Sequence, residues 1–502
     1  MSTPGVGDAS PAPELDRLAA RGRVHLVGVG GAGMSAVAAL LVARGLRVSG
    51  SDARESPALE ALRAAGVVVH LGHDGANVDG AGTLVVSSAI RPTNPELVRA
   101  QELGLPVLHR SAALAALMDG RRSVAVAGAH GKTTTSAMIA VTLEAAGLDP
   151  SYVIGGTVLR TAPDGAPAAT SALGGARHGA GDVLVAEADE SDGSFLAYRP
   201  TIAVVTNVEP DHLDHYGTRE AFEQAFVAFT RRVVPEGWLV ACADDPGAAA
   251  LAQEARAAGV RVRTYGTHPG ADVRIGPWTG SGTGGSTTVT DVEGQVLPLR
   301  LAVPGAHNAL NAGAAWTVAR LLGIDGAQAA HGLATFRGTG RRFEDRGSAH
   351  GVRVVDDYAH HPTEVQALLR AARVVADGGR VLVVFQPHLF SRTATFAAEF
   401  GRALGLADVA VVTDVYAARE DPAPGVTGAL ISDQVPDGTV AAFIADRFEA
   451  AAAVGRAARP GDLVLTVGAG DVTELAPHVL RAVTSPAGRT DDADPSHLPE
   501  GV

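Results

Sequence analysis

The strongest constraint on the fold of this 502-residue chain is the alternation of short Val-rich segments with longer Ala- and Leu-rich segments. The Val-rich segments have strand length, and the segments between them are long enough for helices. Strands that alternate with helices build parallel sheets with helical crossovers. The pattern restarts twice, which divides the chain into blocks at 21–120, 121–343 and 344–484. We therefore predict an α/β protein of three domains, with disordered tails at 1–20 and 485–502.

Ligands of parallel sheets bind beyond the carboxyl ends of the strands, so motifs at those ends are the most informative. Alternating Thr and Val with Gly-rich turns at 270–303 predict a small antiparallel excursion, and the Gly-, Ala- and Pro-rich stretch at 160–182 predicts a surface insertion. A first helix is expected near 33–44. The main strand candidates are 24–29, 47–52, 67–72, 84–90, 123–128, 183–189, 202–208, 352–357, 380–386, 408–415 and 462–468.

Bulk composition excludes several classes of protein. The formal net charge of −13 argues against general nucleic-acid affinity. No apolar run reaches the roughly 20 residues needed to cross a bilayer, and the N-terminus lacks the pattern of a secretory signal. The only cysteine, Cys242, rules out an internal disulfide and a Cys-based metal site. We expect a cytoplasmic protein with small-molecule partners, no nucleic acid and no membrane span.

A single lysine, Lys132, stands among the 41 basic residues, and all the others are arginines. An ammonium group on a thin stem differs from the wide planar guanidinium of arginine. Chance retention of one lysine is the alternative explanation. The position of Lys132 in a phosphate-loop motif favours a required point charge.

That motif, GAHGKTTT, lies between a predicted strand and a predicted helix. In such loops, successive backbone N–H groups and a helix N-terminus converge on phosphate oxygens. Lys132 is expected to reach the β- and γ-phosphates, and Thr133 to offer its hydroxyl to Mg²⁺. The loop is shorter than the usual GxxxxGK[ST] pattern, and a plain glycine turn is the alternative. The predicted ATP-binding residues here are Gly128, Ala129, His130, Gly131, Lys132, Thr133 and Thr134.

Acidic residues follow the next buried strand in the sequence AEADESD at 186–192. A carboxylate that emerges beside a phosphate loop is a common second holder of Mg²⁺. Strand alternation places Glu187 and Asp189 on one face and Glu190 on the other, and we choose Glu187. His212, in EPDHLDHYG after the following strand, is the second candidate metal ligand. A solvated acidic turn and an ordinary polar histidine remain the alternatives.

Asn308, in PGAHNALNA at the start of a predicted helix, has an amide that can both donate to and accept from an adenine edge. Helix capping by the same side chain is an equally good interpretation.

The first block carries a glycine fingerprint. Gly28, Gly30, Gly31 and Gly33 fit G-x-G-x-x-G between a strand and a helix, and Asp52 ends the second strand. The pattern predicts a pyrophosphate at the helix N-terminus. UDP or NAD would supply one, so an NAD-dependent oxidoreductase is a rival interpretation.

Three strand ends of the third block are rich in Asp, His, Tyr and Arg. They read DDYAHHPTE at 356–364, FQPHLFSRT at 386–394 and DVYAARE at 414–420. We expect these three strand ends to be neighbours and to form a polar rim at the edge of one sheet. A buried structural polar network is the alternative, and a non-enzymatic nucleotide switch would leave this rim unexplained.

The ordered set of motifs resembles the Mur ligases of peptidoglycan synthesis over nearly the whole chain between the tails. GVGGAGM, SGSD, GxHGKTTT, EADESD, NxEPDHxD, PGxHNALNA, GxxRRF, DDYxHHPTE, FQPHxxSRT and VGAGD occur in family order. The resemblance implies a Rossmann-like UDP-sugar-binding domain, a P-loop ATPase-like domain, and a C-terminal Rossmann-like, doubly wound domain that closes over both.

Within the family, the motifs resemble members that attach L-alanine to UDP-N-acetylmuramate through an acyl-phosphate. The implied ligands are UDP-N-acetylmuramate, L-alanine, ATP and two Mg²⁺ ions, with Mn²⁺ as a substitute, and the implied state is a monomer or homodimer. A related ligase that returns a whole peptide to the same sugar is a closer alternative, although its Gly-rich opening usually differs from GVGGAGM.

Residue roles follow from the resemblance by matching position. The UDP-sugar site would include His73 and Ser88 besides the glycines and Asp52. Arg342 and Asp357 would hold the ATP ribose and phosphate region. The alanine and acceptor site would consist of Tyr358, His360, His388 and Arg392, and His360 or His388 would be the general base. The expected catalytic set is Lys132, His212, His360, His388 and Arg392.

Two positions depart from the usual family pattern. Ala359 replaces a glycine, and Leu389 replaces an arginine, so Arg392 or another arginine would have to supply the missing cation. Some family members use a carbamylated lysine beside the metals. Lys132 is the only lysine and is already assigned to the phosphates, so this device is excluded here.

Overall fold

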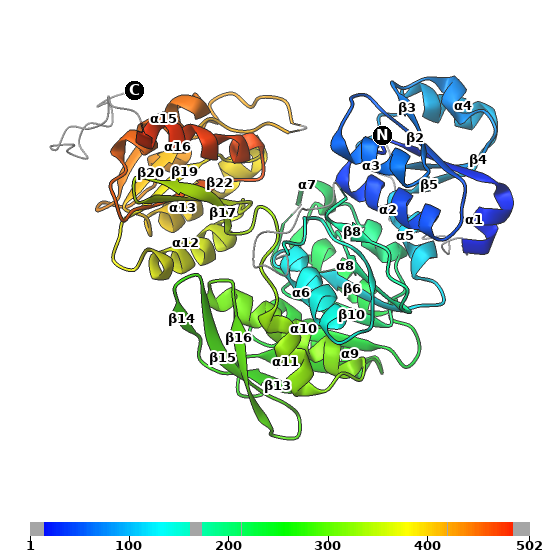
Figure 1. Cartoon of the computed structure of the whole chain (residues 1–502), viewed down its shortest axis with the longest axis horizontal. Helices are drawn as coiled ribbons and strands as arrows, with labels where there is room; N and C mark the ends of the chain where they lie inside the picture. The colour runs from blue at the N-terminus through cyan, green and yellow to red at the C-terminus, as the bar shows by residue number, and fades with distance from the viewer. Residues whose placement is uncertain (1–14, 161–172, 212, 419, 485–502) are drawn as a thin grey trace. The chain divides into compact units, whose positions relative to one another are not determined.

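The computed structural model of the chain describes residues 15–160, 173–211, 213–418 and 420–484 (Figure 1). The chain divides into two compact units. The first consists of the chain up to Pro277 with 287–299 and 310–337, and the second of 278–286, 300–309 and the chain from Gly338 onward.

The first sheet is entirely parallel, with the order β3-β2-β1-β4-β5. The strand order reverses beside β1, so the turn that follows β1 lies at the point where doubly wound sheets bind ligands. Its strands are β1 (Arg23–Val27), β2 (Val48–Asp52), β3 (Val68–Leu71), β4 (Ala81–Val86) and β5 (Val107–His109). Its helices are α1 (Leu15–Arg21), α2 (Ala32–Ala43), α3 (Pro57–Ala64), η1 (Gly75–Val78), α4 (Pro95–Glu102) and α5 (Arg110–Met118).

The second sheet has a parallel centre in which β10 and β9 flank β6. The strand that feeds the phosphate loop therefore lies between the two strands whose ends carry the other predicted site residues. The central strands are β6 (Arg122–Ala127), β7 (Ser151–Val153), β8 (Ala176–Arg177), β9 (Val183–Glu187), β10 (Ile202–Val205), β11 (Trp238–Cys242) and β12 (Arg261–Gly266). The helices are α6 (Lys132–Ala145), η2 (Ser194–Ala197), α7 (Leu213–Tyr216), α8 (Arg219–Thr230), α9 (Pro246–Ala257), α10 (Ala306–Leu321) and α11 (Gly326–Ala334).

The predicted antiparallel excursion at 270–303 is confirmed, because β15 pairs antiparallel with β13 and with β14. The strands of this part are β13 (Val273–Ile275), β14 (Thr279–Ser281), β15 (Gly284–Thr290) and β16 (Val296–Leu301).

The third sheet has the order β17-β18-β22-β19-β20-β21, and only β17 is antiparallel to its neighbour. Successive residues of β19 enter different cores: Val381, Val383 and Phe385 pack in one, and Leu382 and Val384 in the other. Its strands are β17 (Glu344–Ala349), β18 (Val352–Asp357), β19 (Val381–Phe385), β20 (Val409–Val412), β21 (Val440–Phe443) and β22 (Leu463–Val467). Its helices are α12 (Pro362–Ala376), α13 (Phe390–Leu404), α14 (Ala429–Ser432), α15 (Arg447–Ala457), η3 (Asp471–Leu475) and α16 (Ala476–Thr484).

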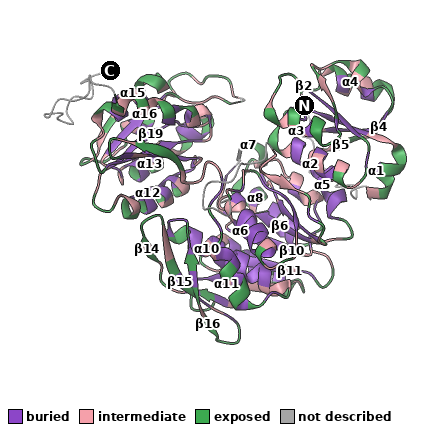
Figure 2. Cartoon of the chain, in the orientation of Figure 1, coloured by how far each residue is buried: buried purple, intermediate pink, exposed green. Residues whose placement is uncertain are grey.

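Burial follows this layered arrangement, since β10 and β19 are buried along their whole length and β6 is buried from Ser123 to Ala127 (Figure 2). Continuous apolar strands of this kind require helices on both faces of the sheet. The predicted α/β class with Rossmann-like, P-loop-like and doubly wound parts is therefore confirmed. No helix of the described residues is both long and apolar enough to span a membrane.

The expected tail at 1–20 overlaps α1 at its C-terminal end. Leu18 of this helix is fully buried, so these residues are part of the folded structure, which the polar composition did not indicate. The rest of that tail, the tail at 485–502 and most of the insertion at 160–182 lie outside the described residues.

Candidate functional site

The phosphate loop connects β6 to α6 and depends on two glycines in left-handed conformations. Gly128 has φ +131° and Gly131 has φ +82°. A Cβ atom at Gly128 would collide with the Thr206 hydroxyl, and one at Gly131 would lie 2.8 Å from Asn311 Oδ1. Only glycine fits both the backbone angle and the space at these positions.

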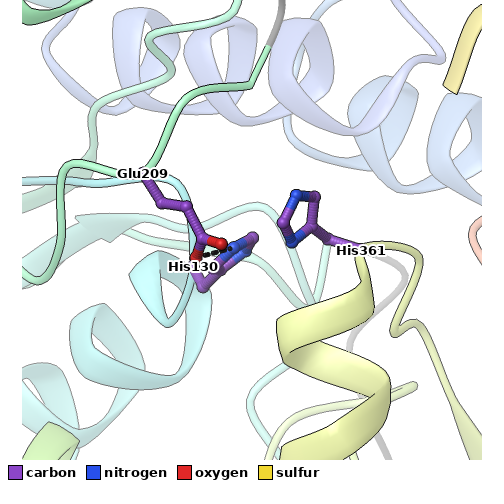
Figure 3. Close-up of side chains that lie close together, drawn as sticks. All are labelled: His130, Glu209 and His361. Carbon is purple, nitrogen blue, oxygen red and sulfur yellow. Dashed lines mark hydrogen bonds and ion pairs between the residues drawn. The ribbon is translucent and has the colours of Figure 1, made fainter. Parts of the chain in front are cut away.

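The end of β10 fixes the loop from the side. The Thr206 hydroxyl and the Asn207 amide donate to the His130 carbonyl oxygen at 2.6 and 2.9 Å, and the His130 N–H donates to Asn207 Oδ1 at 2.9 Å. The His130 ring lies 3.2 Å from Glu209 Oε2 (Figure 3). The neighbouring strand therefore imposes the loop conformation. Thr206 and Asn207 follow β10, and their contacts with the loop were not predicted.

Lys132, the first residue of α6, turns back onto its own loop. Its ammonium group donates to the carbonyl oxygens of Gly128 and Ala129 at 2.8 and 3.3 Å, and to Glu190 Oε1 at 2.8 Å. The predicted position of the sole lysine in a glycine-lined loop is thus observed.

Glu190 is fully buried and is the main counter-charge of Lys132. Burial raises the pKa of Glu190 to about 7, against the opposing effect of Lys132. Burial lowers the pKa of Lys132, but the carboxylates of Glu190, Asp189 and Glu187 outweigh it and hold that pKa above its ordinary value. The prediction that Glu190 faces away from this site is wrong, because β9 ends at Glu187 and strand alternation stops there.

Thr133 and Glu187 lie side by side next to the loop. The Thr133 hydroxyl donates to the two Glu187 oxygens at 3.0 and 3.1 Å, and the Gly155 N–H donates to Glu187 Oε2 at 2.6 Å. Neighbouring ligands of an octahedral Mg²⁺ with bonds of about 2.1 Å are about 3 Å apart. This pair of hard oxygen donors therefore fits Mg²⁺. The predicted second metal ligand, His212, lies outside the described residues.

The glycine turn after β1 is tied to the end of β2. The N–H groups of Gly28 and Val29 donate to the Ser51 carbonyl oxygen at 2.8 and 2.9 Å, and the Gly30 N–H donates to Asp52 Oδ2 at 2.9 Å. Gly31 is the N-cap of α2. In this structure Asp52 thus holds the glycine turn itself, which its sequence position did not indicate.

Within the first unit, residues near the glycine turn also contact the acidic loop that follows β9. The guanidinium of Arg110 lies against Gly33, where a Cβ atom would collide with it, and is 3.8 Å from Asp189 Oδ2. The Ser88 hydroxyl donates to Asp192 Oδ2 at 2.9 Å. Among the predicted UDP-sugar residues, Ser88 therefore contacts the loop that follows β9.

Glu96 was not predicted, yet it is the centre of a polar cluster beneath the glycine turn. Its fully buried carboxylate accepts from the Ser51 hydroxyl at 2.6 Å and from the Asn77 amide at 2.7 Å. The rings of His73 and His25 lie 3.0 and 3.4 Å from it. Burial raises the pKa of Glu96, but these four partners outweigh burial and lower that pKa to about 2.

The depressed pKa of Glu96 predicts a pH-dependent contribution to stability. A carboxyl whose pKa falls from 4.5 to about 2 on folding stabilises the protein fully above pH 4.5, and this contribution is lost as the pH falls towards 2. We expect Glu96→Gln to lower the free energy of unfolding at pH 7, and the difference from wild type to shrink between pH 4.5 and pH 2. Urea unfolding at a series of pH values measures this, and a pH-independent difference would contradict it.

The polar rim predicted for the third sheet is present in the second unit. The rings of Tyr358 and His360 are 5.2 Å apart, those of His360 and His388 5.9 Å, and those of His388 and Tyr416 5.7 Å. Arg392 Nη1 lies 3.5 Å from His388 Nδ1. The expectation of three neighbouring strands is wrong in one place, because β22 lies between β18 and β19, whereas β19 and β20 are adjacent.

Backbone and carboxylate contacts orient the rim. The His360 N–H donates to Glu364 Oε2 at 2.9 Å, and Arg342 Nη1 is 3.6 Å from Glu364 Oε1. The guanidinium groups of Arg341 and Arg342 lie 4.7 and 5.1 Å from the centre of the Tyr358 ring, within the range of cation–π attraction. Arg342 was a predicted site residue, whereas the contact of Arg341 with Tyr358 was not predicted.

The Asp357 carboxylate accepts hydrogen bonds from two backbone N–H groups. It accepts from the N–H groups of Phe343 and Ala359 at 2.7 and 2.8 Å. Burial raises its pKa to about 6, and Arg342 acts in the opposite direction. The departure at Ala359 leaves this contact intact, because only the backbone of Ala359 takes part.

Leu389 has φ +70°, which is strained for a residue other than glycine. Its N–H donates to the Tyr416 carbonyl oxygen at 3.0 Å, which holds the segment between His388 and α13 in place. Arg392 is buried on the first turn of α13.

Asn308 uses its amide to donate to the Pro304 carbonyl oxygen at 2.7 Å. Asn308 is the third residue of α10 and donates in this contact, whereas a capping side chain accepts from a backbone N–H. The capping and adenine interpretations therefore both stay predictions. Asn311 is the amide that lies next to Gly131, and Thr134 lies on the first turn of α6.

The loop geometry predicts the effect of adding one methyl group. We expect Gly128→Ala to lower the affinity for ATP by roughly tenfold or more, because the new Cβ would force the loop away from Thr206 and out of its left-handed conformation. Calorimetric titration with an ATP analogue measures this. Gly147→Ala is a matched control, since Gly147 also has positive φ but no atom within 4 Å of its Cβ position; equal losses in both variants would refute the loop argument.

Comparisons with known proteins agree with this arrangement. The family model described as the Mur ligase middle domain matches residues 126–319, that of the Mur ligase family catalytic domain matches 23–122, and that of the Mur ligase glutamate ligase domain matches 341–470. The UDP-N-acetylmuramate–L-alanine ligase of Kineococcus radiotolerans is 62% identical over 472 residues, which cover 93% of this chain and 97% of that protein. The chain belongs to the Mur ligase family.

Further relatives of this Mur ligase carry the same name. The UDP-N-acetylmuramate–L-alanine ligase of Renibacterium salmoninarum is 56% identical, over 93% of this chain and 97% of its own length. The crystal structure of UDP-N-acetylmuramate–alanine ligase from Thermotoga maritima is similar with a TM-score of 0.75 at 30% identity, and covers 92% of this chain and 99% of that one. The resemblance inferred from the motifs is confirmed, and the oxidoreductase interpretation is set aside.

Proposed function

We propose that this Mur ligase joins L-alanine to the lactyl carboxylate of UDP-N-acetylmuramate, with conversion of ATP to ADP and phosphate. The observation that carries the proposal is the 62% identity to the Kineococcus radiotolerans ligase of that name over nearly the full length of both proteins. The phosphate loop at Lys132 and the glycine turn at Gly28 are the two nucleotide sites that this reaction needs.

The chemistry solves the problem that a carboxylate is a poor acylating agent. An oxygen of the lactyl carboxylate attacks the γ-phosphorus of ATP, the bond to the β-phosphate oxygen breaks, and ADP leaves. The alanine amine then attacks the acyl carbon, the bond to the phosphate oxygen breaks, and inorganic phosphate leaves. Phosphoryl transfer depends mainly on positioning and on positive charge around the equatorial oxygens. Lys132 supplies such a charge when its ammonium exchanges Glu190 for a phosphate oxygen.

Thr133 and Glu187 are proposed to hold Mg²⁺, with His212 as a ligand of a second ion and Mn²⁺ as a substitute. The ion would supply positive charge at the phosphate oxygens. The support is the donor set itself, a hydroxyl and a carboxylate about as far apart as neighbouring ligands of Mg²⁺.

The polar rim of the third sheet is proposed to serve the acceptor chemistry. The amine must arrive neutral, and His360 or His388 would take its proton. Arg392 and Tyr358 would orient the carboxylates. For ATP, Asn308 is proposed to contact the adenine. Arg342 and Asp357 are proposed to contact the ribose and phosphate region.

Residues 21–120 are proposed to bind the UDP-sugar, with His73 and Ser88 among its contacts. Residues 121–343 are proposed to bind ATP, and residues 344–484 to form the ligase domain. We further propose that the enzyme acts in the cytoplasm as a monomer or homodimer.

The test is phosphate release by the full chain with UDP-N-acetylmuramate, ATP, Mg²⁺ and one amino acid or peptide at a time. L-Alanine is expected to give the fastest turnover. Faster turnover with a peptide that begins with L-alanine would instead assign the peptide-recycling reaction. Nucleotide binding without turnover for any acceptor would assign a nucleotide switch.

A further inference from the structure

The start of α4 places a carboxylate where the local backbone favours it. The Asn94 side chain caps the helix by accepting from the N–H groups of Glu96 and Leu97, and Pro95 occupies the first helical position. Glu96 therefore lies in the first turn, where the helix dipole stabilises a negative charge. This sequence makes an ionised Glu96 compatible with complete burial.

Complete burial of a carboxylate is costly unless several donors surround it. The donors of Glu96 come from separate parts of the first sheet: His25 from β1, Ser51 from β2, Asn77 from η1, and His73 from the segment after β3. A purely structural position at the sheet surface could be filled by an apolar side chain. Four converging polar groups instead fix the orientation of each partner.

Two of these partners lead directly to the glycine turn. The Ser51 hydroxyl donates to Glu96, while the Ser51 carbonyl oxygen accepts from Gly28 and Val29. His73 keeps 26% of its side chain exposed, and its Nδ1 lies 3.0 Å from Glu96 Oε2 and 3.1 Å from Ser51 Oγ. Ser51 and Glu96 therefore hold Nδ1 of His73, while part of the ring is exposed to solvent.

We propose that Glu96 is a positioning residue for the UDP-sugar, which holds the His73 ring and, through Ser51, the glycine turn in the conformation that receives the pyrophosphate. The inference rests on the proposed function, because it concerns the same substrate. Glu96 does not touch the substrate; it acts through the two residues that it orients.

The test compares Glu96→Gln with Glu102→Gln in the full chain. Glu102 lies on the same helix but is exposed, where its contact is an ion pair with Arg99. For Glu96→Gln we expect KM for UDP-N-acetylmuramate and Kd for UDP to rise about tenfold or more, from the loss of charged hydrogen bonds. We expect kcat and KM for ATP to change less than about twofold, and Glu102→Gln to match wild type.

A role in stability alone would not separate the two substrates. If Glu96→Gln lowered kcat and raised both KM values together, or left Kd for UDP unchanged, the proposal would be overturned. A cycle with His73→Ala adds a second criterion: the effect of Glu96→Gln on Kd for UDP is expected to be smaller in that background, and an equal effect would contradict action through His73.

The Kd for UDP of Ser51→Ala and of the wild-type protein separates the remaining outcomes. If Glu96→Gln does not fold, Ser51→Ala removes one donor of the same cluster and is expected to raise Kd for UDP, whereas an unchanged Kd would overturn the proposal. Failure of the wild-type protein to bind UDP at all would overturn the proposed function itself. Normal wild-type binding with an unaffected variant would overturn only the role of Glu96.

Discussion

Replacement of Lys132 by alanine is expected to reduce ATP-dependent ligation by about a thousandfold or more while the protein still folds. Lys132 is the only lysine of the chain, and its ammonium group lies inside the glycine loop. The terminal phosphate of ATP would be transferred there, so the positive charge would stabilise the transition state. Folding is expected to survive because Glu190, whose pKa is already raised to about 7, can become neutral when its partner is removed. Phosphate release and thermal unfolding of the purified variant measure the two parts of this prediction.

Lys132→Arg is the matched control, because it keeps the positive charge and changes only its shape. All other residues of the Lys and Arg set in this chain are arginines, so an arginine at position 132 introduces no residue type that is rare in this protein. The wide guanidinium does not match a loop in which Gly128 and Gly131 already pack closely against Thr206 and Asn311. We expect at least a hundredfold loss of activity, on the order found for displaced catalytic charges. Normal turnover by either variant would refute the assignment of Lys132.

The second large effect is expected at the proposed metal site. Glu187→Gln keeps the size of the side chain and removes the negative charge that would hold Mg²⁺, so kcat/KM is expected to fall by about a hundredfold or more. The loss is expected to be partly recovered at high Mg²⁺ or Mn²⁺, because added metal compensates for weaker binding. Steady-state rates over a series of metal concentrations measure this.

Asp182→Asn is a suitable control for Glu187→Gln. Asp182 lies just before β9 and is exposed, where it pairs with Arg122. We expect its metal dependence to match wild type. For the wild-type enzyme, full turnover in excess chelator would contradict the metal site, and so would an unchanged metal dependence in Glu187→Gln.

The sequence predicted the strands best where apolar runs end in charged or polar residues. The strand expected at 352–357 coincides with β18 (Val352–Asp357). The strand expected at 84–90 extends too far, since β4 ends at Val86 and the Ile90 N–H closes a turn onto the Ser87 carbonyl oxygen. An apolar residue such as Ile90 gives no local sign that the strand has ended.

The candidate site was predictable where one short motif contains all its parts. The loop from Gly128 to Thr133 could be identified because Gly131, Lys132 and Thr133 are consecutive and follow a strand, although the loop is shorter than the usual pattern. The side chain of Glu190 was predicted on the wrong face because strand alternation was extended beyond Glu187, the last residue of β9. Glu96 could not be found from the motifs, since its partners come from parts of the chain that only folding brings together; the cap at Asn94 was the one local signal.

The pairing of Lys132 with Glu190 has a consequence for the enzyme before any nucleotide arrives. The loop contains the counter-charge of its own ammonium, so Lys132 is not presented to anions as an isolated cation. A phosphate that binds in the loop as proposed would displace the Glu190 carboxylate as partner of the ammonium. Occupancy therefore depends on a ligand that offers more than charge, such as one that also matches the surrounding backbone N–H groups.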